Sequence, residues 1–406
     1  MSSVQPITPD SKEPRAALLP HEALERAREL YPLVGQGIIY LNHAATGPLS
    51  TRVIDAMSRY YRERSAGRID TYELDVPVVA ECRSLVQRLI RAKSSDRIAL
   101  VASTSDALNI VASGLRWRSG DRIVLNNIEF PANIHPYMSL KRHGVEIDLV
   151  DSPDGRVAPD MIEHALTPRT RLVGISAVQF LSGYRADLRA IGAICRERNI
   201  VFVVDGIQAV GSLDIDVEEM KIDALAAGSQ KWIMGPHGTG FLYVTEALQE
   251  QIEQQYVGWL SMANPWNFYD YKQPLAASAR RYEGGSLNYP GLWGLRAALR
   301  TLTDFGTATI EGHIRALTQI LTDEFERLDM FAVYSPISPT ERAGIVTVQP
   351  AVPLDIQSLF ESMQSRNIRF ALREGRFRFA PHFYNTPDEV RAAAAALSEL
   401  VVSVLR

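Results

Sequence analysis

The stretch from Val201 to Val244 constrains the fold of this chain more than any other. It contains three short apolar runs, at 200–204, 223–227 and 241–244, separated by polar residues, Gly and Pro. A short continuous apolar run that is bounded by turn residues is typical of a strand buried on both faces. The sequence therefore predicts three buried strands in this stretch.

Polar residues stand at the points where the first two of these strands end. Asp205 follows the first run directly, and Lys231 follows the second run after a short polar turn. A lysine flanked by apolar residues can lose its proton by desolvation and attack a carbonyl carbon. A carboxylate at a neighbouring strand end can keep a pyridine nitrogen protonated, and pyridoxal phosphate requires both groups. Taken singly, Asp205 is better explained as a turn cap and Lys231 as a solvated loop residue, so the combination carries the prediction.

The combination resembles the core motif of the class V aminotransferases, a family of fold-type I pyridoxal-phosphate (PLP) enzymes. That family includes cysteine desulfurases, C–S lyases and isopenicillin-N-epimerase-like proteins. The motif reads strand, Asp-x-x-Gln, then Ser-x-Lys-Trp and a Gly/Pro turn, and the resemblance extends from Tyr40 to the C-terminus. It implies that Lys231 forms the internal aldimine, that Asp205 pairs with the pyridine nitrogen and that Gln208 faces the ring hydroxyl.

The resemblance also places the cofactor phosphate. The residues at 98–105 predict a strand that ends in Ser-Thr-Ser before a helix. Free N–H groups at a helix N-terminus attract anions, and by resemblance Thr104 and Ser105 are phosphate ligands. The family's usual Ser-Gly-His-Lys is replaced by a sequence in which Ser229 and Gln230 precede the lysine. Either of these two residues is therefore a candidate phosphate ligand.

Three further positions follow from the family pattern. Phe130 stands where relatives carry an aromatic ring that stacks on the cofactor, and the alternative is that it is plain core. Phe180 matches an Asn that desulfurases place near the ring hydroxyl. Gln179 is the nearest polar substitute, although its side chain is expected to point to the other face of a strand. Ser286 matches a hydroxyl that crosses a dimer interface to the partner's phosphate.

Substrate contacts are expected from both ends of the chain. Asn42 and His43 lie in a loop that lines the active-site entrance in the family, although Asn42 could equally form only a turn. Near the C-terminus, Arg376 and Arg378 precede the family's Tyr-Asn-Thr at 384–386. They share a face of a strand, and the spacing favours Arg378 as the ligand of the substrate α-carboxylate. The structural alternative is an arginine that pairs with a surface carboxylate.

The order of elements predicts an α/β fold. Strands alternate with helices along most of the chain, which is typical of a largely parallel sheet with helices on both faces. The resemblance implies a fold-type I PLP transferase with a mostly parallel seven-stranded sheet and a small C-terminal α/β domain. We expect a flexible arm at 1–20, the large PLP-binding domain at 21–290 and the small domain at 291–406.

Composition excludes several kinds of partner. The chain has 406 residues, 46% of them hydrophobic and 22% charged, with a net charge of −4. Neither a basic surface for nucleic acid nor a membrane-spanning apolar run is expected. The N-terminus lacks the hydrophobic core of a secretion signal, and we expect a cytoplasmic protein. The spacing of the sequence suggests no metal site, and the family implies a homodimer with shared active sites.

The predicted reaction begins on a small L-amino acid through a Schiff base and an α-carbanion. Relatives that form a persulfide carry a Cys on a loop before the final Arg strand, and residues 367–386 contain none. Cys82 and Cys195 lie in helical patterns elsewhere. Lyase or aminotransferase chemistry without a persulfide Cys is therefore the leading prediction.

Two alternatives to this prediction stay open. An amino-acid epimerase would need a second base, and His43 or His382 could serve, unless both are structural. A PLP-binding module without catalysis is less consistent with Lys231, Asp205 and Arg378 being present together. The sequence does not choose between β-elimination, transamination and racemisation after the carbanion forms.

Overall fold

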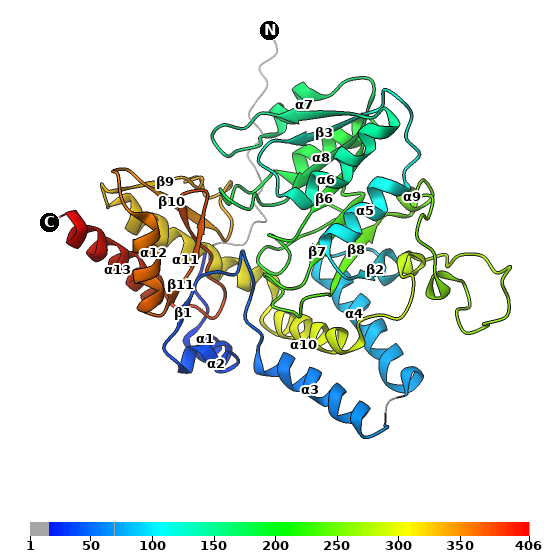
Figure 1. Cartoon of the computed structure of the whole chain (residues 1–406), viewed down its shortest axis with the longest axis horizontal. Helices are drawn as coiled ribbons and strands as arrows, with labels where there is room; N and C mark the ends of the chain where they lie inside the picture. Colours follow the sequence, from blue (N-terminus) through cyan, green and yellow to red (C-terminus); the bar gives the residue numbers. More distant parts are fainter. Residues whose placement is uncertain (1–15, 69, 406) are drawn as a thin grey trace, which may run out of the picture.

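The computed structural model describes residues 16–68 and 70–405, and the chain forms two α/β parts around two sheets (Figure 1). Most of the predicted N-terminal arm, at 1–15, lies outside the described residues. Within residues 16–20, Leu19 is buried and the amide of Ala17 donates to the carbonyl of Gly312. No helix in the described ranges is long and apolar enough to span a membrane.

A seven-stranded sheet forms the centre of the larger part. All neighbouring strands are parallel except β8, which runs antiparallel to both strands beside it. This confirms the predicted fold class with a mostly parallel seven-stranded sheet. In spatial order the strands are β2 (Ile98–Val101), β8 (Gly240–Val244), β7 (Ala224–Gly228), β6 (Val201–Asp205), β5 (Thr170–Ser176), β3 (Arg122–Asn126) and β4 (Glu146–Val150).

Both faces of this sheet are covered by helices, which explains the continuous apolar runs. On β6, Val203 packs into one core cluster, whereas Phe202 and Val204 pack into the other. Successive side chains of a strand point to opposite faces, so a strand covered on both sides is apolar throughout. The helices of this part are α3 (Thr51–Ser65), α4 (Val76–Leu89), α5 (Thr104–Gly114), α6 (His135–Met138), α7 (Pro159–Ala165), α8 (Leu188–Glu197), α9 (Glu246–Gln249) and α10 (Tyr289–Phe305).

The smaller part is built mainly from the C-terminal quarter of the chain (Figure 1). An antiparallel sheet has the order β12 (Ala371–Arg373), β13 (Arg376–Phe379), β10 (Val346–Pro350) and β9 (Phe331–Val333). The helices are α11 (Thr307–Glu326), α12 (Ile356–Ser365) and α13 (Pro387–Leu405). The N-terminal helices α1 (His21–Glu29) and α2 (Pro32–Gly35) precede β1 (Ile39–Tyr40), which pairs in parallel with β11 (Ile368–Arg369).

Two segments pack differently from the predicted domains, which place residues 21–290 in the large domain and residues 291–406 in the small one. β1 pairs with a strand of the smaller part, although it was assigned to the large domain. Helix α10 packs against α3 and α4, and its Leu295 lies in a core cluster of the larger part. Helix α10 therefore buries its apolar face against helices of the larger part, and residues 291–305 belong to that part.

Candidate active site

Asp205 lies at the carboxyl end of β6, buried at 1% exposure. Its Oδ1 accepts a hydrogen bond from the backbone N–H of Ile207 at 2.9 Å. Its Oδ2 has no hydrogen-bond partner among the described residues. Burial raises the pKa of Asp205 to about 7, and the negative charge of Glu129 adds to this, while the nearby Lys231 opposes it. One carboxylate oxygen is thus held ready for a cationic partner.

Lys231 lies in the turn between β7 and β8, at the same edge of the sheet as Asp205. Burial lowers its pKa to about 8; Asp205 acts against this shift, and the charge of Arg378 adds to it. The Nζ atom stands 5.3 Å from the centre of the Phe130 ring. The turn packs tightly, because a Cβ at Gly47 would lie 2.3 Å from the Lys231 carbonyl oxygen. The amine is therefore partly desolvated and beside an aromatic face.

The predicted phosphate ligands lie at the start of α5, where the preceding Ser103 caps the helix. Thr104 is buried, and its hydroxyl accepts a hydrogen bond from the N–H of Gly228 at 2.8 Å, whereas Ser105 is exposed. The helix N-terminus is thereby tied to the end of β7, three residues before Lys231. An anion at this helix end would lie beside the lysine turn.

The turn before the lysine separates the two alternative phosphate ligands. Ser229 is fully buried, and its hydroxyl bonds to the carbonyl of Pro236 at 2.8 Å and to the hydroxyl of Thr239 at 2.6 Å. Gln230 is only partly buried, and its backbone carbonyl accepts from the N–H of Gly47 at 2.7 Å. The Ser229 hydroxyl is engaged within the turn, which does not fit its prediction as a phosphate ligand and leaves Gln230 as the candidate.

Gln208 lies under the lysine turn at 3% exposure. Its Nε2 donates to the carbonyl of Ala44 at 3.0 Å, and its Oε1 accepts from the indole N–H of Trp232 at 2.8 Å. The amide joins the N-terminal loop to the residue after Lys231. The predicted contact of Gln208 with the ring hydroxyl stays a prediction.

Arg378 is deeply buried, at 2% exposure, and forms no ion pair within the described residues. One guanidinium nitrogen donates to the carbonyl of Phe180 at 2.6 Å, and its Nε has no partner among the described residues. Burial lowers its pKa to about 10. By contrast, Arg376 lies over the ring of Tyr334 and donates to Gln349. The structural alternative of a surface ion pair does not hold for Arg378.

The two histidines near the site, His43 and His382, are both held by the fold. His43 is fully buried, with Nδ1 bonded to the carbonyl of Ala380 at 2.8 Å and Nε2 to the hydroxyl of Tyr384 at 3.0 Å. His382 is also buried, and its ring nitrogens bond to the carbonyl of Trp232 and the N–H of Phe383. Burial lowers the pKa of His43 to about 4. The prediction that His43 touches substrate is not supported, because both ring nitrogens are occupied by the fold.

Asn42 keeps a free group at the entrance loop. It is partly buried, and its Oδ1 has no hydrogen-bond partner in the described ranges. Its backbone carbonyl accepts from Ala45 and Thr46, so it also forms the turn. Both readings of Asn42, turn former and substrate contact, agree with this placement.

Phe130, the residue that is predicted to stack on the cofactor ring, pairs with the ring of Phe180. Phe130 is 42% exposed, and it meets Phe180 edge to face with 5.5 Å between ring centres. Phe180 also supplies the carbonyl that holds Arg378. The exposed face of Phe130 is available for stacking, as predicted for the cofactor ring.

Sequence reasoning missed Glu129 and misjudged Gln179. Gln179 is 1% exposed, and its Nε2 donates to Glu129 Oε1 at 3.0 Å. Its side chain therefore points toward Glu129, not to the opposite face of the sheet as expected. Glu129 is 7% exposed and also binds Ser176, the strand neighbour of Asp205. A carboxylate three residues after a buried strand, at the ligand-binding edge, was the available signal.

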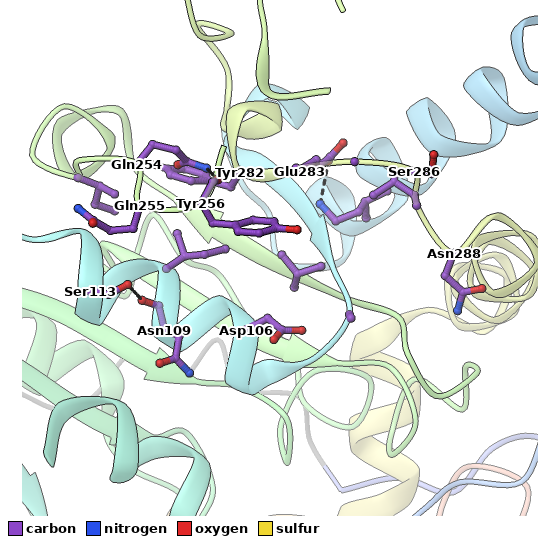
Figure 2. A pocket seen from close by; sticks show the side chains of 18 of the residues that line it. Asp106, Asn109, Ser113, Gln254, Gln255, Tyr256, Tyr282, Glu283, Ser286 and Asn288 are labelled. Atoms are coloured by element: carbon purple, nitrogen blue, oxygen red, sulfur yellow. Dashed lines mark hydrogen bonds between the residues drawn. The ribbon is translucent and has the colours of Figure 1, made fainter. Parts of the chain in front are cut away.

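Ser286 lies apart from these groups. It is exposed on a loop that borders a cavity of about 530 Å³, and Figure 2 shows that loop above helix α5, which carries Asp106 and Asn109. Neither Lys231 nor Arg378 lines this cavity. The predicted reach of Ser286 to a partner's phosphate stays a prediction.

The residues at this edge fit pyridoxal phosphate. The unpartnered Asp205 Oδ2 suits a protonated ring nitrogen, the Phe130 face suits the ring, and the α5 N-terminus suits the phosphate. Lys231 has the lowered pKa that covalent attachment to an aldehyde requires. The fold brings Asp205, Lys231, Phe130 and the start of α5 to one edge of the large sheet.

Known proteins resemble this chain over most of its length. The aminotransferase class-V family matches residues 39–376. A probable cysteine desulfurase of Methanothermobacter thermautotrophicus is 30% identical over 89% of this chain and 94% of its own length. A cysteine desulfurase of Salmonella dublin is 27% identical over 92% of this chain and 93% of its own length.

Solved structures share the fold. The apo cysteine desulfurase of Thermococcus onnurineus superposes with a TM-score of 0.85 at 25% identity, covering 96% of this chain and all of the other. A cystine C–S lyase in complex with cysteine persulfide gives a TM-score of 0.83 at 24% identity, covering 91% of this chain and 99% of the other. The chain thus belongs to the class-V aminotransferase family and is a pyridoxal-phosphate-dependent enzyme.

Proposed function

We propose that this enzyme acts on a small L-amino acid, with C–S lyase-like or aminotransferase chemistry that uses no persulfide cysteine. The observation that carries the proposal is the buried, unpaired Arg378 at the same site as Lys231 and Asp205. A buried cation without a counter-ion is costly, and a substrate carboxylate would supply the missing charge. The α-carboxylate of an amino acid is the partner that a planar guanidinium binds with two parallel hydrogen bonds.

Each residue has a defined task in the proposed reaction. When bound, pyridoxal phosphate supplies the electron sink that stabilises a negative charge at the substrate α-carbon. Arg378 orients the substrate through its carboxylate. The Lys231 amine, with its pKa lowered by burial, takes the α-proton as a general base. Asp205 holds the proton on the ring nitrogen through its free Oδ2.

The placement of the two cysteines supports a mechanism without a persulfide. Cys82 is buried in α4, where its Sγ donates to the carbonyl of Leu292, and Cys195 is buried in α8. Burial raises the pKa of both thiols to about 12, which keeps them protonated and unreactive near neutral pH. The hairpin between β12 and β13 turns through Glu374 and Gly375, so no long loop precedes Arg378.

Replacing Cys82 and Cys195 together by Ala should leave the catalytic rate unchanged, because neither thiol reaches the site. The variant should lose only stability, by about 1–2 kcal/mol for two small buried side chains. Steady-state kinetics beside thermal unfolding measures both effects. A variant that folds normally yet no longer releases sulfur from a substrate would restore the desulfurase mechanism.

The similarity to cysteine desulfurases and to a cystine C–S lyase favours sulfur-containing amino acids as the first substrates to test. One structural relative is a cystine C–S lyase, and the relative from Salmonella dublin is a cysteine desulfurase. A panel of amino acids, assayed for keto acid, sulfide and loss of α-deuterium, separates β-elimination, transamination and racemisation. The epimerase alternative loses its candidate second bases, because His43 and His382 are both buried with occupied ring nitrogens.

Arg378→Ala should weaken the use of amino acids by about 2–5 kcal/mol in kcat/KM, the cost of removing one partner of a buried charge pair. Amines without an α-carboxylate should be poor substrates of the wild type and should be barely affected by the change. Arg378→Lys keeps the charge but loses the planar fork, so it should recover only part of the loss. Kinetics on matched amine and amino-acid pairs measures the difference.

Arg376→Ala is the matched control, because Arg376 lies on the same strand but contacts Tyr334 and Gln349. It should keep the wild-type preference for amino acids. Equal losses on amines and amino acids in Arg378→Ala would assign Arg378 a structural role and reopen the substrate class.

A homodimer with shared active sites and a cytoplasmic location are further parts of this proposal. Ser286 is exposed at the rim of the cavity in Figure 2, where a second copy could reach it. Mixing Lys231→Ala chains with Ser286→Ala chains should produce hybrids that contain one intact site and regain activity. Full activity of a verified monomer in sedimentation experiments would contradict the shared site, and fractionation of cells tests the location.

A further inference from the structure

Glu129 is a buried carboxylate that the proposed mechanism does not use. It follows β3 and is 7% exposed. Its Oε1 accepts from Asn126 Nδ2 at 2.7 Å, from the backbone N–H of Ser176 at 2.7 Å and from Gln179 Nε2 at 3.0 Å. Its Oε2 accepts from the Ser176 hydroxyl. In the described part of the chain no lysine or arginine forms an ion pair with it, so donors alone satisfy this carboxylate.

The position of Glu129 connects it to Asp205. Ser176, which donates twice to Glu129, is the register partner of Asp205 on the neighbouring strand. Burial raises the pKa of Asp205 and of Tyr137, which lies in α6, and the negative charge of Glu129 adds to both shifts. Lys231 is the cation that faces Asp205 from the next turn and lowers its pKa. Two carboxylates therefore lie within electrostatic reach at one edge of the sheet.

Several polar atoms around these carboxylates are buried without a partner in the described residues. They are Asp205 Oδ2, Gln179 Oε1, the amide of Asn133 and the hydroxyl of Tyr137. Unsatisfied buried polar atoms are rare in folded proteins and indicate a bound group or water. Glu129 holds the Nε2 end of Gln179, which leaves the Oε1 end as an acceptor. Glu129 thus fixes the side chain of Gln179, whose Oε1 is free to accept a hydrogen bond from a bound group.

We propose that Glu129 is a positioning residue of the cofactor site. It fixes Ser176 and Gln179 beside Asp205, and it places a second negative charge behind the carboxylate that holds the ring nitrogen. A second negative charge stabilises a proton at that nitrogen, because a cation is favoured by each anion nearby. The inference rests on the proposed function for the role of Asp205.

The test is Glu129→Gln, which exchanges one oxygen for an amide nitrogen. The amide Oε1 can accept from Asn126, the Ser176 N–H and Gln179. The amide N–H₂ can donate to the Ser176 hydroxyl, which then accepts a hydrogen bond instead of donating one. The geometry stays and only the charge is lost. The absorbance of bound cofactor as a function of pH should show a midpoint lowered by roughly half a unit or more. Ser176→Ala, which removes a hydrogen bond but no charge, should keep the wild-type midpoint.

Three outcomes would overturn the inference. One is a wild-type midpoint in Glu129→Gln, and another is an equal shift in Ser176→Ala. The third is a Glu129→Gln chain that no longer folds while Ser176→Ala does, because an electrostatic role predicts a shifted titration in an intact protein. The failure of the proposed function looks different, since the wild type would then turn over no amino acid, while the pH titration of its bound cofactor and the shift in Glu129→Gln would be unchanged.

Discussion

Asp205→Asn should slow turnover by about three orders of magnitude while most of the cofactor stays bound. The amide keeps the shape of the side chain and the hydrogen bond from Ile207, but it removes the charge that favours a protonated ring nitrogen. Losing one electrostatic contact to a developing charge in a buried site costs roughly 10²–10³-fold or more. Rapid-reaction measurement of α-deuterium loss isolates the affected step.

Asp223→Asn serves as the matched control. Asp223 is also a largely buried carboxylate of this sheet, and it accepts a hydrogen bond from the N–H of Phe202 at 2.9 Å. It lies before β7, at the opposite end of the strands from Asp205. This variant should turn over normally. Near-normal turnover in Asp205→Asn would remove Asp205 from the mechanism.

Lys231→Ala should abolish turnover and the covalent bond to the cofactor. The lysine both attaches the cofactor and moves the α-proton, so its loss removes a nucleophile and a general base, together roughly four orders of magnitude or more. Burial lowers the pKa of its amine to about 8, so wild-type activity should rise with pH as the amine becomes neutral. Kinetics across pH, beside cofactor absorbance, measures both properties.

Lys272→Ala is the control for this prediction, because Lys272 is exposed on a loop far along the chain from the motif. It should keep the yellow colour, the rate and the pH profile of the wild type. Residual turnover in Lys231→Ala with an unchanged pH profile would show that another group takes the α-proton.

The central strands and the pair Asp205 and Lys231 were predictable because they depend on local patterns. A sheet covered on both faces requires apolar residues at every strand position, and parallel strands end at one edge. Asp205 ends one such strand, and Lys231 follows the next strand after Ser229 and Gln230, so sequence order alone brings them together. Arg378 needed the family spacing, and its deeper burial separates it from Arg376, which is partly buried and donates to Gln349.

Other features depend on contacts that no local pattern reveals. His43 was expected at the site entrance, but its ring is held by Ala380 and Tyr384 from the other end of the chain. Helix α10 was assigned to the small domain, yet its apolar face packs on α3 and α4. The strands β9, β11 and β12 are too short to show a period of two. Glu129 gains its partners from Ser176 and Gln179, which only the fold brings near.

The most direct test of this account is borohydride reduction of the purified yellow protein, followed by proteolysis and mass spectrometry of the peptides. Reduction makes the bond between the cofactor and its lysine permanent. The account predicts the label on the peptide that contains Lys231, between Gln230 and Trp232, and no label in Lys231→Ala. A label on any other lysine, or none in wild-type protein that carries cofactor, would contradict the assignment of the site.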